Sequence, residues 1–158
     1  VLMTFGGLGL TRIPYDGLNQ FPDWQFITFD QEPPALPNLI GLRNLRYGDA
    51  GVPLRPVDVM PLCGRVIAKP GFSTFSEACR LGTPIISITR DDFPEASVLL
   101  EGIQHYVPHR IVPTEDFFDG NWQFLREPLH PPLDPRPVTD GNQMITEAVI
   151  NFLQKAYH

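Results

Sequence analysis

The segment KPGFSTFSE, from Lys69 to Glu77, combines the residue types and spacing with the clearest chemistry in this sequence. A Lys-Pro-Gly turn follows a short apolar run, and small and hydroxyl residues then open a predicted helix. The N-terminus of a helix presents unpaired backbone N–H groups and the positive end of the helix dipole, so it can bind a phosphate group. The candidate phosphate-binding residues are Lys69, Gly71, Ser73 and Thr74. The two hydroxyl residues would also serve as ordinary helix N-caps.

Glu77 lies near the start of the same predicted helix and can accept hydrogen bonds from a sugar diol beside the phosphate. Its spacing from Ser73 and Thr74 also suits a capping box or a plain surface position. A dinucleotide site joins a helix end for pyrophosphate with a carboxylate for ribose. Here the acid follows the turn on one helix instead of on the next strand, which favours a nucleotide-sugar over a dinucleotide cofactor.

Short apolar runs rich in β-branched and aromatic residues predict six strands. They lie at residues 1–5, 24–29, 38–42, 65–68, 84–88 and 110–112. The segments between them predict helices at 57–62, 73–81, 95–105 and from Thr114 to about Leu125, with a partly helical stretch at 11–19. Gly82 should end the second of these helices, since glycine readily adopts a positive φ.

Strands that alternate with helices predict a three-layer α/β/α fold with a Rossmann-like, doubly wound parallel sheet of about six strands. In such a sheet the ligand-binding loops follow the carboxyl ends of the strands. Gly6 and Gly7 follow the first strand, and Lys69 and Gly71 follow the fourth. These two strands should flank the topological switch point, so we expect the two glycine-containing loops to face one crevice.

These motifs resemble the donor-binding C-terminal half of two-domain nucleotide-sugar glycosyltransferases, the GT-B fold. The resemblance is closest to the glycosyltransferase family 28 C-terminal domain. KPGFSTFSE, followed by RDDFPE at residues 90–95, is also similar to the glycosyltransferase-like part of some sugar kinases. The resemblance is clearest over residues 68–99. The first loop, GGLGL, departs from the serine- and glutamine-bearing form that is common in the family.

The resemblance implies a role for each matching position. Gly6 and Gly7 join the phosphate-binding residues named above, and Glu77 binds ribose. The residues placed beside the transferred sugar are Arg90, Asp91, Asp92 and Glu95. Val57 and Met60 occupy the place where the family binds the nucleobase through backbone groups, although the aromatic residue of the family is a proline here.

The implied activity is transfer of a hexosyl group from a nucleotide diphosphate sugar, a UDP-sugar first of all, to an acceptor hydroxyl with inversion at the anomeric carbon. No metal and no cofactor is implied, because helix N–H groups and a cation can stabilise the leaving diphosphate. The general base and the acceptor site belong to an N-terminal domain, which we expect to precede this fragment. This chain alone should therefore bind donor without turnover. The alternatives are a nucleotide-sugar 2-epimerase and a non-catalytic nucleotide-sugar-binding module.

Composition limits the remaining possibilities. The chain has 158 residues, a net charge of −6 and a hydrophobic fraction of 42%, which fits a globular domain with no basic surface for nucleic acid. No apolar run is long enough for a transmembrane segment and no signal peptide is visible, so we expect a cytoplasmic protein with Cys63 and Cys79 as reduced, buried thiols. The four histidines have no metal-ligand spacing and are interpreted as structural: His105, His109, His130 and His158.

The C-terminal part has a different character. We expect a Rossmann-like nucleotide-sugar-binding domain over residues 1–126, followed at 127–158 by a proline-rich crossing and a terminal helix that packs on the same domain. Prolines make the segment from Glu127 to Pro137 extended. The helix should begin at Thr139 or Asp140. Its apolar face carries Ile145, Val149, Phe152 and Leu153.

Overall fold

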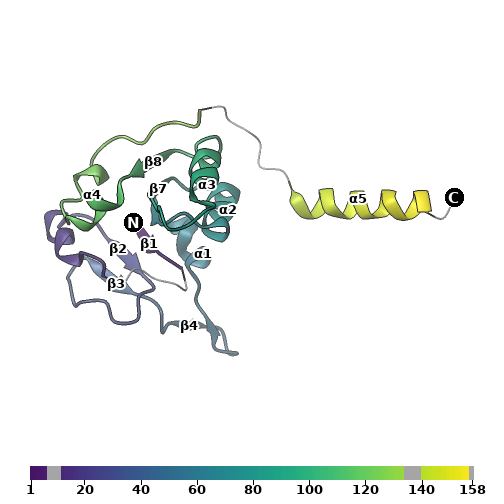
Figure 1. The fold of residues 1–158 in the computed structure, drawn as a ribbon. Helices are drawn as coiled ribbons and strands as arrows, with labels where there is room; N and C mark the ends of the chain where they lie inside the picture. Colours follow the sequence, from purple (N-terminus) through teal and green to yellow (C-terminus); the bar gives the residue numbers. More distant parts are fainter. Residues whose placement is uncertain (7–11, 134–139, 157–158) are drawn as a thin grey trace.

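A computed structural model describes residues 1–6, 12–133 and 140–156 of the chain. Its centre is a six-stranded, all-parallel sheet in the order β3-β2-β1-β6-β7-β8 (Figure 1). The strands are β1 (Leu2–Thr4), β2 (Phe26–Thr28), β3 (Leu39–Gly41), β6 (Val66–Ala68), β7 (Ile85–Ile88) and β8 (His109–Val112). They correspond to the six strands expected from the sequence, and the predicted α/β/α, Rossmann-like fold class is confirmed.

The strand order reverses between β1 and β6, which pair in parallel with Leu2 opposite Val66 and Thr4 opposite Ala68. Successive strands run outward from β1 to β3 on one side and from β6 to β8 on the other. The connections therefore leave β1 and β6 in opposite directions, and their carboxyl ends flank a topological switch point. The predicted neighbourhood of the first and fourth strands is thus confirmed.

Helices cover both faces of the sheet because adjacent residues of the buried central strands point to opposite sides. Leu2 packs with Val59, Phe75 and Ile103, whereas Met3 belongs to a second cluster with Phe117. The first face carries α1 (Pro56–Val59), the 3₁₀ helix η2 (Met60–Leu62), α2 (Phe72–Leu81) and α3 (Ala96–Ile103). The second carries η1 (Tyr15–Gln20), α4 (Thr114–Phe118) and η3 (Gln123–Leu125). Each fully buried aliphatic side chain stabilises this arrangement by about 1.5–3 kcal/mol.

The helix α2 begins at Phe72, one residue earlier than expected, and Gly71 is its N-cap with an extended backbone. Ser73 and Thr74 therefore lie in the first turn, and neither is the N-cap residue. Glu77 does not form a capping box with them, because the cap residue has no side chain. Gly82, with φ of 66°, ends the helix as predicted.

The prediction of a single helix from Thr114 to about Leu125 is wrong. The chain forms two short helices, α4 and η3, separated by residues 119–122. Trp122 is fully buried, its ring stacks on Phe117 at a centroid distance of 5.0 Å, and its Nε1 donates to the Phe117 carbonyl oxygen at 2.7 Å. Burying this large side chain back against α4 turns the chain and ends the helix. The helix also has Pro113 as its N-cap, not Thr114.

Two edge features lie outside the predicted pattern. A small antiparallel hairpin, β4 (Arg46–Tyr47) and β5 (Val52–Pro53), was not anticipated because its strands have two residues each. The described part of the proline-rich segment, residues 127–133, forms no helix, in agreement with the prediction. It also pairs with the sheet, since the backbones of His109 and His130 exchange two hydrogen bonds of 2.9 Å. This pairing covers part of the exposed edge of β8.

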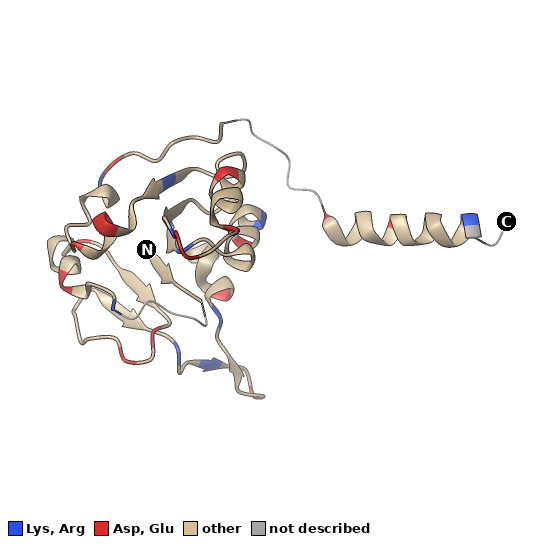
Figure 2. Cartoon of the chain, viewed as in Figure 1, with Lys and Arg blue, Asp and Glu red and all other residues tan. Residues whose placement is uncertain are grey.

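The terminal helix α5 (Gly141–Ala156) stands apart from the α/β body in Figure 1. Its apolar residues are exposed, with Ile145 at 66% and Phe152 at 70%. Glu147 and Lys155 are its charged residues, and Figure 2 shows how few charges it carries. We expected this helix to pack on the same domain, but its apolar face is uncovered, and the division of the chain after residue 126 stays a prediction. Thr139 lies outside the described residues.

The contact between η1 and the α4–η3 turn gives a test of the fold. A Cβ atom on buried Gly17 would lie 2.3 Å from the carbonyl oxygen of Gly120, whereas nothing lies within 4 Å of one on Gly102. We expect Gly17→Ala to lower the free energy of unfolding by about 1–3 kcal/mol, since backbone atoms must separate. Gly102→Ala, inside α3, should raise it by about 0.5–1 kcal/mol. Urea denaturation of both variants measures the difference, and equal stabilities would contradict this packing.

Candidate functional site

The loops after β1 and β6 meet at the switch point, as the sequence predicted. A Cβ atom built on Gly6 would lie 3.9 Å from Cε of Lys69. Gly6 has φ of 69°, a left-handed conformation that glycine adopts without strain and that turns the backbone sharply after the strand. Gly71 caps α2 beside Lys69, so one glycine turn, one lysine and one helix N-terminus lie together. Gly7 lies outside the described residues.

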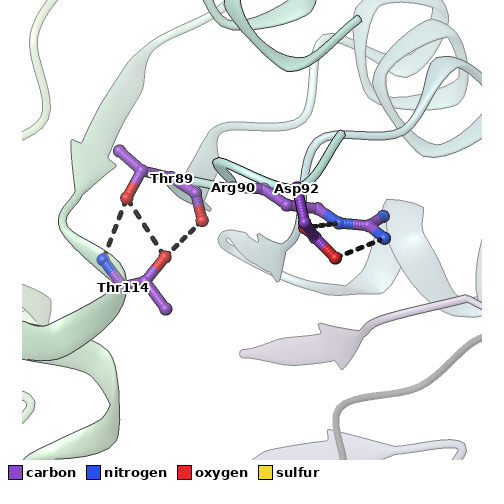
Figure 3. Close-up of polar contacts among 4 residues, drawn as sticks. All are labelled: Thr89, Arg90, Asp92 and Thr114. Carbon is purple, nitrogen blue, oxygen red and sulfur yellow. Dashed lines mark hydrogen bonds and ion pairs between the residues drawn. The ribbon is translucent and has the colours of Figure 1, made fainter. Parts of the chain in front are cut away.

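The loop that follows β7 is electrostatically coupled to this point. Burial and the cation of Arg90 lower the pKa of Lys69, while the carboxylate of Asp92 opposes that change. Arg90 Nε donates to Asp92 Oδ1 at 2.8 Å (Figure 3), and its guanidinium lies over the ring of Phe93 at 4.9 Å. The hydrogen bond from Arg90 lowers the pKa of Asp92. Lys69 thus lies within electrostatic range of the Arg90–Asp92 pair.

A second set of hydrogen bonds fixes the end of β7 from which this loop departs. Thr89 Oγ1 accepts a hydrogen bond from the Thr114 backbone N–H at 3.0 Å, and the Thr114 hydroxyl bonds to the carbonyl oxygen of Thr89 (Figure 3). The loop is therefore tied to the start of α4. The other two predicted sugar-binding residues, Asp91 and Glu95, are exposed to solvent. Glu95 is the N-cap residue of α3, but its side chain makes no capping hydrogen bond.

Glu77 lies within electrostatic range of the start of α1, the segment in which the base contacts are predicted. It is half-buried, and burial raises the pKa of its carboxyl group against the opposing effect of Arg55. Asp58 raises it further. As the sixth residue of α2, Glu77 lies about 7 Å along the axis from the first residue of the helix. Its charged neighbours are thus those at the start of α1.

A cleft of about 660 Å³ opens over the carboxyl ends of β1 and β2 and extends to the segment before α1. Among the described residues predicted for the site, only Gly6 lines it. The other polar and charged residues that line the cleft are Thr4, Thr28, Asp30, Gln31, Arg43 and Arg55. Arg43 Nη1 donates to the Phe29 carbonyl oxygen at 3.5 Å, and Arg55 is paired with Asp58 at 3.0 Å.

Within this cleft, Asp30 is held by a closed ring of hydrogen bonds. Its Oδ2 accepts from the Tyr15 hydroxyl at 3.0 Å, and its backbone N–H donates to Thr28 Oγ1 at 3.1 Å. Tyr15 and Thr28 are 3.2 Å apart, and because the single Tyr15 proton goes to Asp30, Thr28 donates to Tyr15. Both supporting residues are buried, at 8% and 1% exposure. Asp30 Oδ1 accepts a further bond from the N–H of Gln31 at 2.8 Å.

The two predicted base-contact positions differ in burial. The side chain of Met60 is fully buried in the core below the first helical layer, so a nucleobase contact at this position would involve its backbone groups, the kind of contact expected from the sequence here. Val57 is half-buried and follows directly after Arg55 and Pro56, which do line the cleft. Met60 belongs to the 3₁₀ turn that packs under α2, and the apolar pattern alone did not distinguish that role.

The sequence interpretation did not single out Asp30, Tyr15, Arg43 or Arg55. One signal was available for Asp30, an acid directly after a predicted strand and 24 positions beyond Gly6. No comparable signal marks Arg43 or Arg55, which lie in loops whose path depends on the hairpin. Tyr15 reaches Asp30 only through the packing of η1 against β2.

Some expectations concern other groups of the chain. Cys63 and Cys79 are unpaired as expected, yet each is half-buried, and burial raises the pKa of both thiols. His109 is buried with Nδ1 3.2 Å from the Val107 carbonyl oxygen, consistent with a structural role, and His158 lies outside the described residues. In residues 1–6, 12–133 and 140–156, no three His, Cys, Asp or Glu residues gather as metal ligands would. None of the helices described combines the length and apolar character needed to cross a membrane.

Comparisons with family models, curated proteins and solved structures find no match for this chain. The resemblance to the GT-B glycosyltransferases therefore stays a prediction from the residues at 68–99. The description of the fold and of the geometry of the site comes from the structure alone.

The ring of hydrogen bonds around Asp30 gives a pH test. Burial first of all raises the pKa of Tyr15 from 10.0 to about 12. The unfolded chain loses this proton near pH 10, so the contribution to stability is complete below pH 10 and is lost as the pH rises towards 12. Tyr15→Phe should cost about 1 kcal/mol at pH 7 and should flatten the alkaline fall in the free energy of unfolding. Denaturant unfolding from pH 7 to 12 measures both effects.

Tyr47→Phe is the matched control, because Tyr47 is 50% exposed on the hairpin. Its alkaline profile should follow that of the unchanged protein. If the free energy of unfolding of Tyr15→Phe falls with pH as steeply as that of the unchanged protein, ionisation of Tyr15 does not contribute to the alkaline loss of stability.

Proposed function

We propose that this domain binds a nucleotide diphosphate sugar across the switch point between β1 and β6, as the donor-binding half of an inverting, metal-independent glycosyltransferase. The observation that carries the proposal is the meeting of Gly6 and Lys69 beside the N-terminus of the ten-residue helix α2. Ligands of doubly wound sheets bind at such a switch point, and a helix N-terminus with a lysine favours a diphosphate.

The positions of the charged groups favour one arrangement of the diphosphate, the sugar and the nucleoside along the site. Lys69 and the first N–H groups of α2 suit the diphosphate, while the loop with Arg90 and Asp92 suits the transferred sugar through its hydroxyl groups. The nucleoside then lies towards the cleft that Gly6 shares with Arg55 and Pro56. A UDP-sugar remains the first candidate on the sequence resemblance.

In the proposed reaction, the donor-binding half would mainly stabilise negative charge. In the transfer, the acceptor oxygen forms a bond to the anomeric carbon as the bond from that carbon to the diphosphate oxygen breaks. The acceptor proton passes to a general base, and negative charge develops on the leaving diphosphate. Lys69 and the helix N–H groups are positioned to stabilise that charge without a metal ion.

A nucleotide-sugar 2-epimerase would use the same donor contacts but give a different product. Incubating the full-length protein with a UDP-sugar distinguishes the two activities. Transfer to an acceptor, or slow donor hydrolysis, releases UDP and supports the transferase. Conversion of the sugar to its 2-epimer supports the alternative. If neither reaction occurs, a non-catalytic binding module is favoured.

Lys69 gives the direct test of binding. UDP, GDP and ADP are titrated against the domain, and the one that binds should raise its melting temperature, since a ligand of the native state stabilises it. Lys69→Gln should weaken that nucleotide by about 10- to 100-fold, or about 1.5–3 kcal/mol, the range for a hydrogen bond to a charged group. Calorimetry of both proteins measures the loss.

Lys155→Gln removes the only other lysine of the chain, on the exposed helix α5, and should leave the affinity unchanged. If none of the three nucleotides binds at millimolar concentration, the proposed function fails. If a nucleotide binds equally well to both lysine variants, the diphosphate does not lie at Lys69.

A further inference from the structure

Three histidines lie together at the outer edge of the sheet, beside its last strand β8. His109 belongs to that strand and is only 3% exposed. The ring of His130 lies 5.8 Å from the ring of His109, measured between centroids. His105 follows α3 by two residues, and among the described residues its buried Nδ1 has no hydrogen-bond partner. Imidazoles ordinarily change charge between about pH 5 and 8, so this cluster can respond to small changes in pH.

The cluster joins the sheet to a segment that leads towards α5. We call residues 127–133 the strap. The backbone N–H of His130 donates to the carbonyl oxygen of His109 at 2.9 Å, and the His109 N–H donates back to His130 at the same distance. Further along the strap, the N–H of Leu133 donates to the carbonyl oxygen of Gln104 at 2.9 Å. The strap thus covers part of an edge strand that would otherwise present unpaired backbone groups.

One ion pair also holds the strap in place. Arg110 Nη1 lies 2.6 Å from Glu127 Oε2, and its Nη2 donates to the carbonyl oxygen of Pro128 at 2.6 Å. Carboxyl and guanidinium groups ordinarily titrate outside the range from about pH 5.5 to 7.5. Within that range, the histidines are therefore the groups of this contact that change charge.

The surroundings of His109 favour its neutral form. Burial lowers the pKa of His109, and the charges of His130 and His105 lower it further, whereas a hydrogen bond to the Val107 carbonyl opposes the change. On the neighbouring strand β7, the residue paired with His109 is the uncharged Ile85. A group whose pKa lies below its ordinary value stabilises the structure fully above that value, here 6.5, and this contribution is lost as the pH falls below it.

We propose that His109 and His130 form a proton-sensitive latch, which holds the strap on β8 while both imidazoles are neutral and releases it when they become charged. Two positive rings 5.8 Å apart repel each other, and the Glu127 carboxylate already contacts Arg110. Release breaks the backbone pairing of His109 with His130. It uncovers the edge of β8 and lengthens the free connection before α5. This inference is independent of the proposed function.

Hydrogen exchange of single amides, followed by NMR on the intact chain at pH 7.5 and 5.5, tests the latch. Protection factors, corrected for the intrinsic pH dependence of exchange, report local opening. Those of the His130 and Leu133 amides should fall by about 3-fold or more at the lower pH, the repulsion of two unit charges 5.8 Å apart in water. The amide of Val66, which donates to the Pro84 carbonyl at 2.9 Å in the sheet centre, should change by less than about 2-fold.

Variants separate the imidazoles from the rest of the contact. His130 is exposed, so His130→Gln should keep the fold and reduce the pH effect on the strap amides. The double variant His109→Asn with His130→Gln should remove that effect. Glu127→Gln is the matched control, because it breaks the ion pair with Arg110. It should lower strap protection by a similar factor at both pH values and preserve the pH effect.

The imidazole signals of the unchanged protein give an independent readout, in which His109 should titrate below pH 6.5. A titration of His109 above that value would overturn the latch. Equal strap protection at the two pH values would also overturn it, as would an undiminished pH effect in His130→Gln. A loss of protection at Val66 as large as that of the strap would show general unfolding and would contradict a local release.

Discussion

The parallel pairing of β1 with β6 is the constraint on which the rest of this structure depends. Three backbone positions pair between them, from Leu2 opposite Val66 to Thr4 opposite Ala68. The pairing brings two loops that are distant in the chain to the same edge of the sheet, and Gly6 meets Lys69 there, 63 positions later in the sequence. Because every later strand adds outward from this pair, the position of the crevice follows from it. The charged loop after β7 then lies beside Lys69.

Hydroxyl groups that are buried or half-buried support the loops around the site. On one side, Tyr15 and Thr28 fix Asp30 at the end of β2. On the other, Thr89 and Thr114 fix the departure of the loop that contains Arg90. A buried hydroxyl without a partner is costly, so these residues stabilise the fold only if the pairs remain intact. These hydrogen bonds hold the loops after β2 and β7 in defined conformations.

The pattern of apolar residues and glycines predicted the main features of the fold correctly, because these features depend on local properties of the chain. The central strands of the sheet are buried between helical layers, so their near-continuous apolar sequences mark them clearly, as in Ile85–Ile88. The end of α2 at Gly82 follows from the preference of glycine for a positive φ. Prediction was wrong where distant packing decides local structure. Trp122 ends α4 by packing back on Phe117, so the single helix expected there is divided in two.

The sequence by itself determined the strand and helix order, the parallel sheet and the meeting of the Gly6 and Lys69 loops, because periodicity and turn chemistry are local properties of the chain. Tertiary structure alone decided which acid faces the cleft. Glu77 follows a glycine turn and Asp30 follows a strand, and both positions suit a binding acid by pattern alone. Their surroundings differ through the charge of Arg55 near Glu77 and the hydrogen bond from Tyr15 to Asp30, and both of these neighbours come from other elements. A side chain's direction depends on its non-local neighbours, and a linear pattern does not contain them.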